Sequence, residues 1–128
     1  MIKPILKFSP KAILFDWDNT LVNNWEPIFF AYKETLKKLG LRSQSREEIL
    51  KNSKYSLRET FPRVFKDDWI KAKKIFYTNI KKIHLKKIKP IRNAERVLKT
   101  INKKKIIYGV ISNKDGNLLR KEIKKLGW

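Results

Sequence analysis

Two short and continuously apolar runs constrain the fold of this sequence more than any other feature. The first, KAILF at residues 11–15, ends at Asp16, and the second, KIIYGVISN, occupies residues 105–113. Such runs are typical of strands buried on both faces of a parallel sheet. Parallel neighbours need a long crossover, which the intervening residues can supply as helices. The sequence therefore predicts an α/β fold built on parallel strands.

Helical patterns fill the sequence between these runs. Asn24 is expected to cap the first helix, and Gly40 is placed to end it. Two capping-box patterns, SREE at residues 45–48 and SLRE at 56–59, open further helices. A longer helix then runs until Pro90, which cannot continue it. This part of the chain is therefore expected to be entirely helical.

The predicted elements divide the chain into a core and an insertion. Residues 24–88 form the helical insertion, whereas residues 1–23 and 89–128 form an α/β core with only two strands. A parallel sheet of two strands cannot bury both faces of each strand. The simplest expectation is that the sequence is a truncated or split piece of a longer α/β protein.

Composition narrows the classes of function. The formal charge of +20 comes from 25 lysines and only 7 arginines, and arginine is the residue favoured for base and bidentate phosphate contacts. We therefore expect no specific nucleic-acid partner, although a non-enzymatic basic binding module stays open as an alternative. The absence of cysteine excludes disulfides and thiolate metal sites. No apolar run reaches the ~18 residues of a membrane span, so a soluble cytoplasmic protein without a membrane partner is expected.

Asp16 and Asp18 follow the first strand, and Ser112 follows the second. Functional groups of open α/β folds gather at the carboxyl ends of strands. One carboxylate there can attack phosphorus, while the other protonates the leaving oxygen and later activates water. Two carboxylates would repel a phosphate, so a hard cation such as Mg²⁺ is expected. The Ser112 hydroxyl and nearby N–H groups can hold phosphate oxygens.

At this point the sequence resembles a known family. DWDNTLV at residues 16–22 is similar to the first motif, D-x-D-x-T/V, of the haloacid dehalogenase superfamily of phosphohydrolases. GVISNK at residues 109–114 resembles its second motif, a strand that ends in Ser or Thr. The helical block lies where the phosphoglycolate-phosphatase-like group carries an α-helical cap. The resemblance covers residues 13–127 and implies a partial Rossmann-like parallel-sheet core with an inserted α-helical cap.

The resemblance also implies residue roles. Asp16 would be the nucleophile and a Mg²⁺ ligand through its carboxylate. Asp18 would be the general acid/base and a Mg²⁺ ligand through its backbone carbonyl. Ser112, helped by Asn113, would bind the phosphoryl group during transfer. The implied activity is Mg²⁺-dependent hydrolysis of a small phosphorylated metabolite through an aspartyl-phosphate.

The sequence departs from the family in two ways. Asn19 stands where the family usually has glycine, and asparagine is among the few residues that tolerate a left-handed backbone. The family's third motif, a lysine, and its fourth motif, an acidic pair, have no counterpart in these 128 residues. The resemblance therefore implies weak or absent activity for this chain, or a split enzyme in which a complementing C-terminal fragment supplies these groups.

Three other polar features receive ordinary structural interpretations. Asp67 and Asp68 are expected to begin a helix rather than to bind metal. Lys114 is expected on a solvated face rather than as a substitute for the missing lysine. His84, the sole histidine, is expected on a helix surface rather than as a metal ligand.

Overall fold

The computed structural model describes residues 10–128, so residues 1–9 of the predicted core segment 1–23 lie outside the described residues. Strand β1 (Ala12–Phe15) pairs in parallel with β4 (Ile107–Val110), with Ala12 opposite Ile107 and Phe15 opposite Val110. The predicted α/β fold with a parallel sheet is confirmed. The register is the feature that positions the site, because it brings the carboxyl ends of both strands to one edge.

Six α-helices accompany this strand pair within residues 10–128. They are α1 (Trp25–Lys38), α2 (Arg46–Asn52), α3 (Leu57–Phe65), α4 (Trp69–Lys87), α5 (Ala94–Lys103) and α6 (Gly116–Leu126). Both predicted capping boxes form, at Ser45 with Glu48 and at Ser56 with Glu59. A 3₁₀ turn, Lys66–Asp68, leads into α4, which agrees with the helix-start interpretation of Asp67 and Asp68. None of these helices has the combination of length and apolar character that a bilayer crossing needs.

A second, short strand pair lies where the chain enters and leaves the helical insertion. β2 (Val22–Asn23) pairs antiparallel with β3 (Lys89–Pro90). The sequence did not predict these strands, because two residues are too few to show an alternating pattern. The pairing holds the two connections side by side, so α1 begins close to the place where α4 ends.

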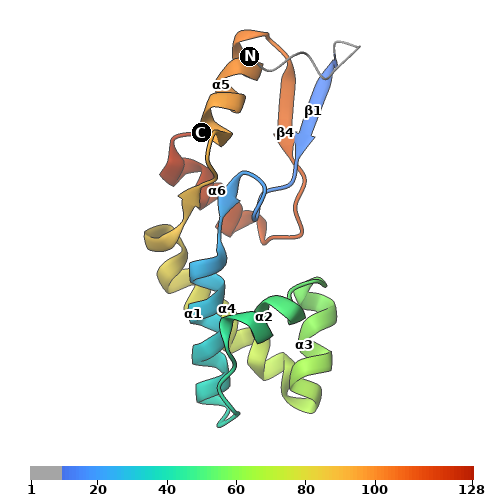
Figure 1. Ribbon diagram of the computed structural model, residues 1–128, viewed down its shortest axis with the longest axis vertical. Helices are drawn as coiled ribbons and strands as arrows, with labels where there is room; N and C mark the ends of the chain where they lie inside the picture. Colours follow the sequence, from blue (N-terminus) through green and yellow to red (C-terminus); the bar gives the residue numbers. More distant parts are fainter. Residues whose placement is uncertain (1–9) are drawn as a thin grey trace.

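Two apolar clusters fill the interior. One lies among α1, α3 and α4, where Phe61 packs at 5.0 Å from Phe65 and 5.3 Å from Phe76 between ring centroids. The other surrounds the segment after β1, where Trp17 meets Trp128 edge-on at 5.9 Å and 79°. Leu118 of α6 belongs to the cluster of the insertion. Figure 1 shows the strand pair at one end of the molecule and α2 and α3 at the other, with α1 and α4 between them.

One face of the β1–β4 pair is not covered by the described residues, whereas Phe15 and Val110 on the other face pack against the cluster around Trp17. Leu14, Ile107 and Ile111 expose 63%, 74% and 64% of their surface. The expectation that both strands are buried on both faces is therefore not met between residues 10 and 128. The physical reason is that a sheet of two short strands offers no neighbouring strand, and the helices beside it cannot cover both faces.

Candidate active site

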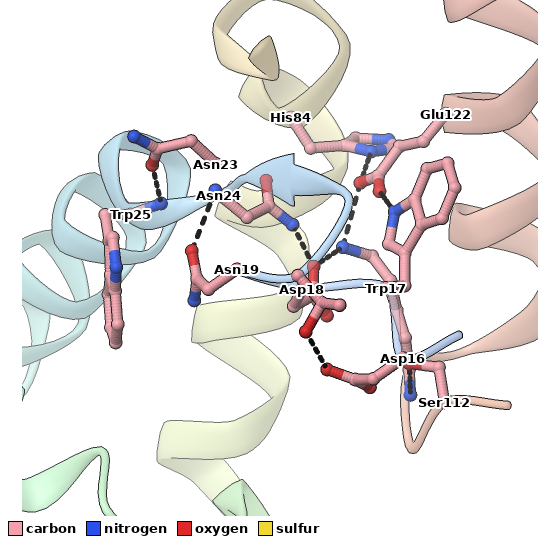
Figure 2. A network of polar contacts seen from close by, with 12 residues as sticks. Asp16, Trp17, Asp18, Asn19, Asn23, Asn24, Trp25, His84, Ser112 and Glu122 are labelled. Atoms are coloured by element: carbon pink, nitrogen blue, oxygen red, sulfur yellow. Dashed lines mark hydrogen bonds and ion pairs between the residues drawn. The ribbon is translucent and has the colours of Figure 1, made fainter. Parts of the chain in front are cut away.

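Asp16, Asp18 and Ser112 lie at the carboxyl edge of the β1–β4 pair (Figure 2). The N–H of Ile111 donates to the Phe15 carbonyl at 2.8 Å, which extends the parallel pairing to the last residue before Asp16 and the last before Ser112. The Asp16 side chain is exposed, and its Oδ2 accepts from the Thr20 hydroxyl at 3.1 Å. Asp18 is half-buried. The two segments predicted to share the chemistry therefore lie side by side.

A tight loop after β1 sets the direction of these carboxylates. The Trp17 carbonyl accepts from the N–H groups of Thr20 and Leu21 at 3.2 and 3.0 Å. The N–H of Asn19 donates to the Val22 carbonyl at 2.6 Å. Trp17 itself is buried and anchors the loop to the core. Asp16 and Asp18 are thus carried on either side of a fixed aromatic residue.

Asn19 adopts the left-handed conformation that its position requires, with φ 59°. Its Oδ1 also accepts from the backbone N–H of Asn24 at 3.2 Å. The conformational argument made from sequence is therefore confirmed, and the side chain adds a hydrogen bond that glycine would lack.

Replacing Asn19 tests this loop. Asn19→Ala is expected to lower the free energy of unfolding by about 1–2 kcal/mol, because alanine pays the steric cost of a left-handed backbone. Asn19→Gly is expected to change it by only a few tenths, since glycine adopts that conformation freely and only the hydrogen bond is lost. Urea unfolding of the two variants measures the difference, and equal stabilities would contradict the conformational account.

Asn24 holds the predicted N-cap position of α1, but its side chain does not cap the helix. Its Nδ2 instead donates to Oδ1 of Asp18, and Asn23 accepts from the N–H of Trp25 at 3.2 Å. The predicted cap is thus corrected, because a buried amide beside a carboxylate forms the stronger, charge-assisted bond. The first residue of the insertion thereby contacts a predicted catalytic residue.

Lys114 is not on a solvated face, and that prediction is wrong. Its side chain is only 9% exposed, and its Nζ lies 2.8 Å from Asp18 Oδ1 and 3.0 Å from Glu122 Oε1. Two carboxylates offset the desolvation of the ammonium group, which is why a lysine can be buried here.

His84 is also misplaced by the sequence prediction of a helix surface. It is 2% exposed, and its Nδ1 lies 2.7 Å from Glu122 Oε1. The sequence spacing could have indicated that His84 is buried. Along α4 the buried residues recur at intervals of four, at Ala72, Phe76, Ile80 and His84. Glu122, fully buried on α6, is the site residue that the sequence analysis missed.

Ser112 and Asn113 follow β4 as expected. The Ser112 Oγ accepts from the N–H of Lys114 at 3.1 Å, which fixes the turn while leaving the hydroxyl hydrogen available as a donor. Asn113 is exposed beside it. A serine in such a turn can therefore hold its local structure and still donate to an anion.

Tyr77 of α4 is a further neighbour of the site. Burial raises the pKa of the Tyr77 hydroxyl, and the negative charges of Asp115 and Asp18 raise it further. The phenol therefore stays protonated at neutral pH and remains a hydrogen-bond donor on the insertion side.

Comparison with solved structures finds proteins of similar fold. A haloacid dehalogenase-like family hydrolase from Streptococcus pneumoniae superposes with a TM-score of 0.83 at 23% identity, over 92% of this chain and 56% of that one. A predicted phosphatase from Clostridium acetobutylicum superposes with a TM-score of 0.80 at 18% identity, over 91% and 56%. At such low identity these similarities show a shared fold.

Comparison of sequences identifies the family. A Clostridium perfringens protein named as a pyrophosphatase, PpaX, is 30% identical over 118 residues, which are 91% of this chain and 55% of that protein. The chain thus spans about half the length of this relative. The sequence profile of the family described as haloacid dehalogenase-like hydrolase matches residues 13–128. Because that match includes both motifs and the helical insertion, the chain belongs to the haloacid dehalogenase-like hydrolase family.

Proposed function

We propose that this chain carries the phosphoryl-transfer site of a Mg²⁺-dependent phosphatase that acts on a small phosphorylated metabolite. The observation that carries the proposal is the position of Asp16 and Ser112, which each follow the last paired residues of adjacent parallel strands. A nucleophilic carboxylate and a hydroxyl donor are thereby brought to one sheet edge, where open α/β folds bind their ligands.

The reaction divides between the two aspartates. A carboxylate oxygen of Asp16 attacks phosphorus, and the bond from phosphorus to the ester oxygen breaks. The carboxyl group of Asp18 gives its proton to that leaving oxygen. The Asp18 carboxylate then takes a proton from water, whose oxygen attacks the aspartyl-phosphate and releases inorganic phosphate. Ser112 and Asn113 donate hydrogen bonds to the oxygens of the phosphoryl group.

The donors at the site suit Mg²⁺. No three His, Cys, Asp or Glu side chains converge as a metal site within residues 10–128. However, the Asp16 carboxylate and the Asp18 carbonyl are hard oxygen donors, and Mg²⁺ is commonly held by one or two carboxylates with water and phosphate filling its other positions. Such an ion would offset negative charge on the phosphate as bonds form and break.

We propose that residues 24–88 act as a cap over a core made of residues 1–23 and 89–128. Two contacts support this assignment. The paired strands β2 and β3 hold together the two core segments from which the insertion leaves and to which it returns, and Asn24, at the start of the insertion, bonds to Asp18. A helical insertion attached this close to the site can exclude water during transfer. The name of the Clostridium perfringens relative supports a small phosphorylated substrate, such as pyrophosphate.

We propose further that full activity needs groups outside these 128 residues. The family's lysine and acidic pair have no counterpart here, and losing one such group typically lowers the rate by roughly 10²–10⁴-fold. The uncovered side chains of Leu14, Ile107 and Ile111 support a further segment that packs on the sheet. That segment is either continuous with this chain in a longer polypeptide or supplied as a complementing fragment.

The test compares the 128-residue chain with a version extended by the residues encoded immediately downstream. Hydrolysis of p-nitrophenyl phosphate is followed with Mg²⁺ and with a chelator. Borohydride reduction then traps any aspartyl-phosphate, and mass spectrometry locates the modified residue. We expect Mg²⁺-dependent turnover, slow in the 128-residue chain, and a label at Asp16. A label elsewhere, or turnover that the chelator leaves unchanged, contradicts the proposal.

A further inference from the structure

One buried carboxylate gathers side chains from three distant parts of the chain (Figure 2). Glu122 Oε2 accepts from the indole N–H of Trp17 at 2.7 Å, and its Oε1 lies 2.7 Å from His84 Nδ1 and 3.0 Å from Lys114 Nζ. Glu122, His84 and Trp17 are 0%, 2% and 1% exposed. The four residues come from the loop after β1, helix α4, the loop after β4 and helix α6. We call them the Glu122 network.

The contacts of Glu122 explain how its burial is tolerated. A buried carboxylate is strongly destabilising unless its oxygens are bonded, and here both oxygens have partners. Polar networks in which every group is bonded make a site rigid. Lys114 depends most on these contacts, because fixing its flexible four-carbon side chain costs rotamer entropy that its two ion pairs offset.

Lys114 connects the network to the proposed chemistry. Its Nζ lies between two carboxylates, 2.8 Å from Asp18 Oδ1 and 3.0 Å from Glu122 Oε1. Within residues 10–128, Lys114 is the residue that forms an ion pair with Asp18. Asp16 and an incoming phosphate are negative, and Asp18 becomes negative once it has given its proton to the leaving oxygen, so a cation fixed at this point reduces the repulsion among them.

We propose that Lys114 is a positioning residue of this site, whose ammonium group orients Asp18 and offsets the charge of the aspartate pair, and that Glu122 fixes it there. The inference rests on the proposed phosphatase function and adds a basic group to it. His84 extends the arrangement to the insertion, since it lies on the buried face of α4.

Measurements of phosphate affinity distinguish whether the charge of Lys114 or only its packing matters to the site. Binding of inorganic phosphate to the 128-residue chain with Mg²⁺ is measured by calorimetry for Lys114→Met, Lys114→Arg and the control Lys121→Met. Methionine fills similar space without charge, whereas arginine keeps the charge in a larger side chain. We expect Lys114→Met to weaken binding roughly 10- to 100-fold, as a charge about 4 Å away implies at intermediate dielectric. Lys114→Arg retains most of the affinity.

The control guards against general attraction of anions to a chain of charge +20. Lys121 is exposed on α6, next to Glu122 in sequence, so Lys121→Met removes the same charge from solvent. It is expected to change phosphate affinity less than about twofold, because exposed charges are screened. Equal losses for Lys121→Met and Lys114→Met, or better binding by Lys114→Met than by Lys114→Arg, overturn the proposal. Failure of the unchanged chain to bind phosphate also overturns the proposal.

A second measurement tests the part played by Glu122. Ammonium protons of a buried, doubly bonded lysine exchange slowly with water and give an NMR signal, whereas those of exposed lysines do not. We expect such a signal in the unchanged chain, and its loss in Lys114→Met assigns it to Lys114. The signal is expected to remain in Lys121→Met and to broaden in Glu122→Gln. Cooperative urea unfolding shows that each variant is folded. No slow ammonium signal in the unchanged chain would refute the network.

The two proposals fail in different ways. If the borohydride label does not appear at Asp16 but phosphate affinity still depends on the Lys114 charge, the phosphatase mechanism is wrong and the cationic site stands. If the label appears at Asp16 and Lys114→Met binds phosphate normally, the mechanism stands and the inference about Lys114 is wrong.

Discussion

Asp16→Asn is expected to remove Mg²⁺-dependent hydrolysis and the covalent phosphoryl label together. Asparagine keeps the size of the side chain and can still accept from Thr20, whose hydroxyl lies 3.1 Å from Asp16 Oδ2. It lacks the anionic oxygen that attacks phosphorus, so the path through an aspartyl-phosphate is closed. The rate is expected to fall by roughly 10⁴-fold or more, in line with the loss of other enzymatic nucleophiles. Rates come from p-nitrophenyl phosphate hydrolysis, and labelling from mass spectrometry after borohydride reduction.

The matched control is Asp67→Asn. Asp67 is an exposed aspartate in the turn before α4, at the far end of that helix from His84. Removing its charge is expected to leave the rate within about twofold, because exposed charges at a distance are screened. Labelling that persists in Asp16→Asn would assign the nucleophile to another residue. Reading the label separately from turnover keeps the test decisive even when turnover is slow.

Glu122→Ala is expected to have the largest effect on stability among single polar substitutions. Alanine leaves the Lys114 ammonium group, His84 and the Trp17 indole N–H without their common acceptor in the interior. Removing one member of a buried ion pair typically lowers the free energy of unfolding by about 3–5 kcal/mol. A domain of this size has only about 5–15 kcal/mol in total. Urea unfolding followed at several protein concentrations measures the loss.

Glu95→Ala provides the comparison. Glu95 pairs with Lys99 at 2.7 Å, but the two side chains are 55% and 70% exposed. Such helix-surface pairs contribute about 0.3–0.5 kcal/mol, so Glu95→Ala is expected to be nearly neutral. A loss below about 1 kcal/mol for Glu122→Ala, or a loss equal to that of Glu95→Ala, means that the Glu122 network does not form in solution.

Local signals explain what the sequence could predict. The apolar runs identified β1 and β4, and the capping boxes at Ser45 and Ser56 set the starts of α2 and α3, because each depends on residues close in sequence. The two aspartates after β1 were recognised for the same reason. The parallel pairing then followed from the burial pattern and from the length of the crossover.

Long-range contacts explain what the sequence could not predict. Lys114 lies 96 residues from Asp18, and His84 lies 38 residues from Glu122. No periodicity within one helix reveals such partners, so Lys114 and His84 were assigned to solvent by their polarity; the four-residue spacing along α4 could have shown that His84 is buried, but not what it contacts. Asn24 was assigned to the cap of its own helix for a similar reason, since the competing acceptor on Asp18 is brought near only by the fold. The apolar character of the strands was recognised, but Leu14, Ile107 and Ile111 stay exposed within residues 10–128.

The edge-on packing of Trp17 and Trp128 has an optical consequence. With ring centroids 5.9 Å apart and planes 79° apart, the electronic transitions of the two indoles mix and produce paired bands of opposite sign in the circular dichroism spectrum. Trp128→Phe should abolish this couplet, whereas Trp69→Phe, on the insertion, should leave it intact. Because Trp17 sits between Asp16 and Asp18, any rearrangement of that loop changes the couplet. The protein therefore carries a chromophore pair that reports on the loop of Asp16 and Asp18 without an added label.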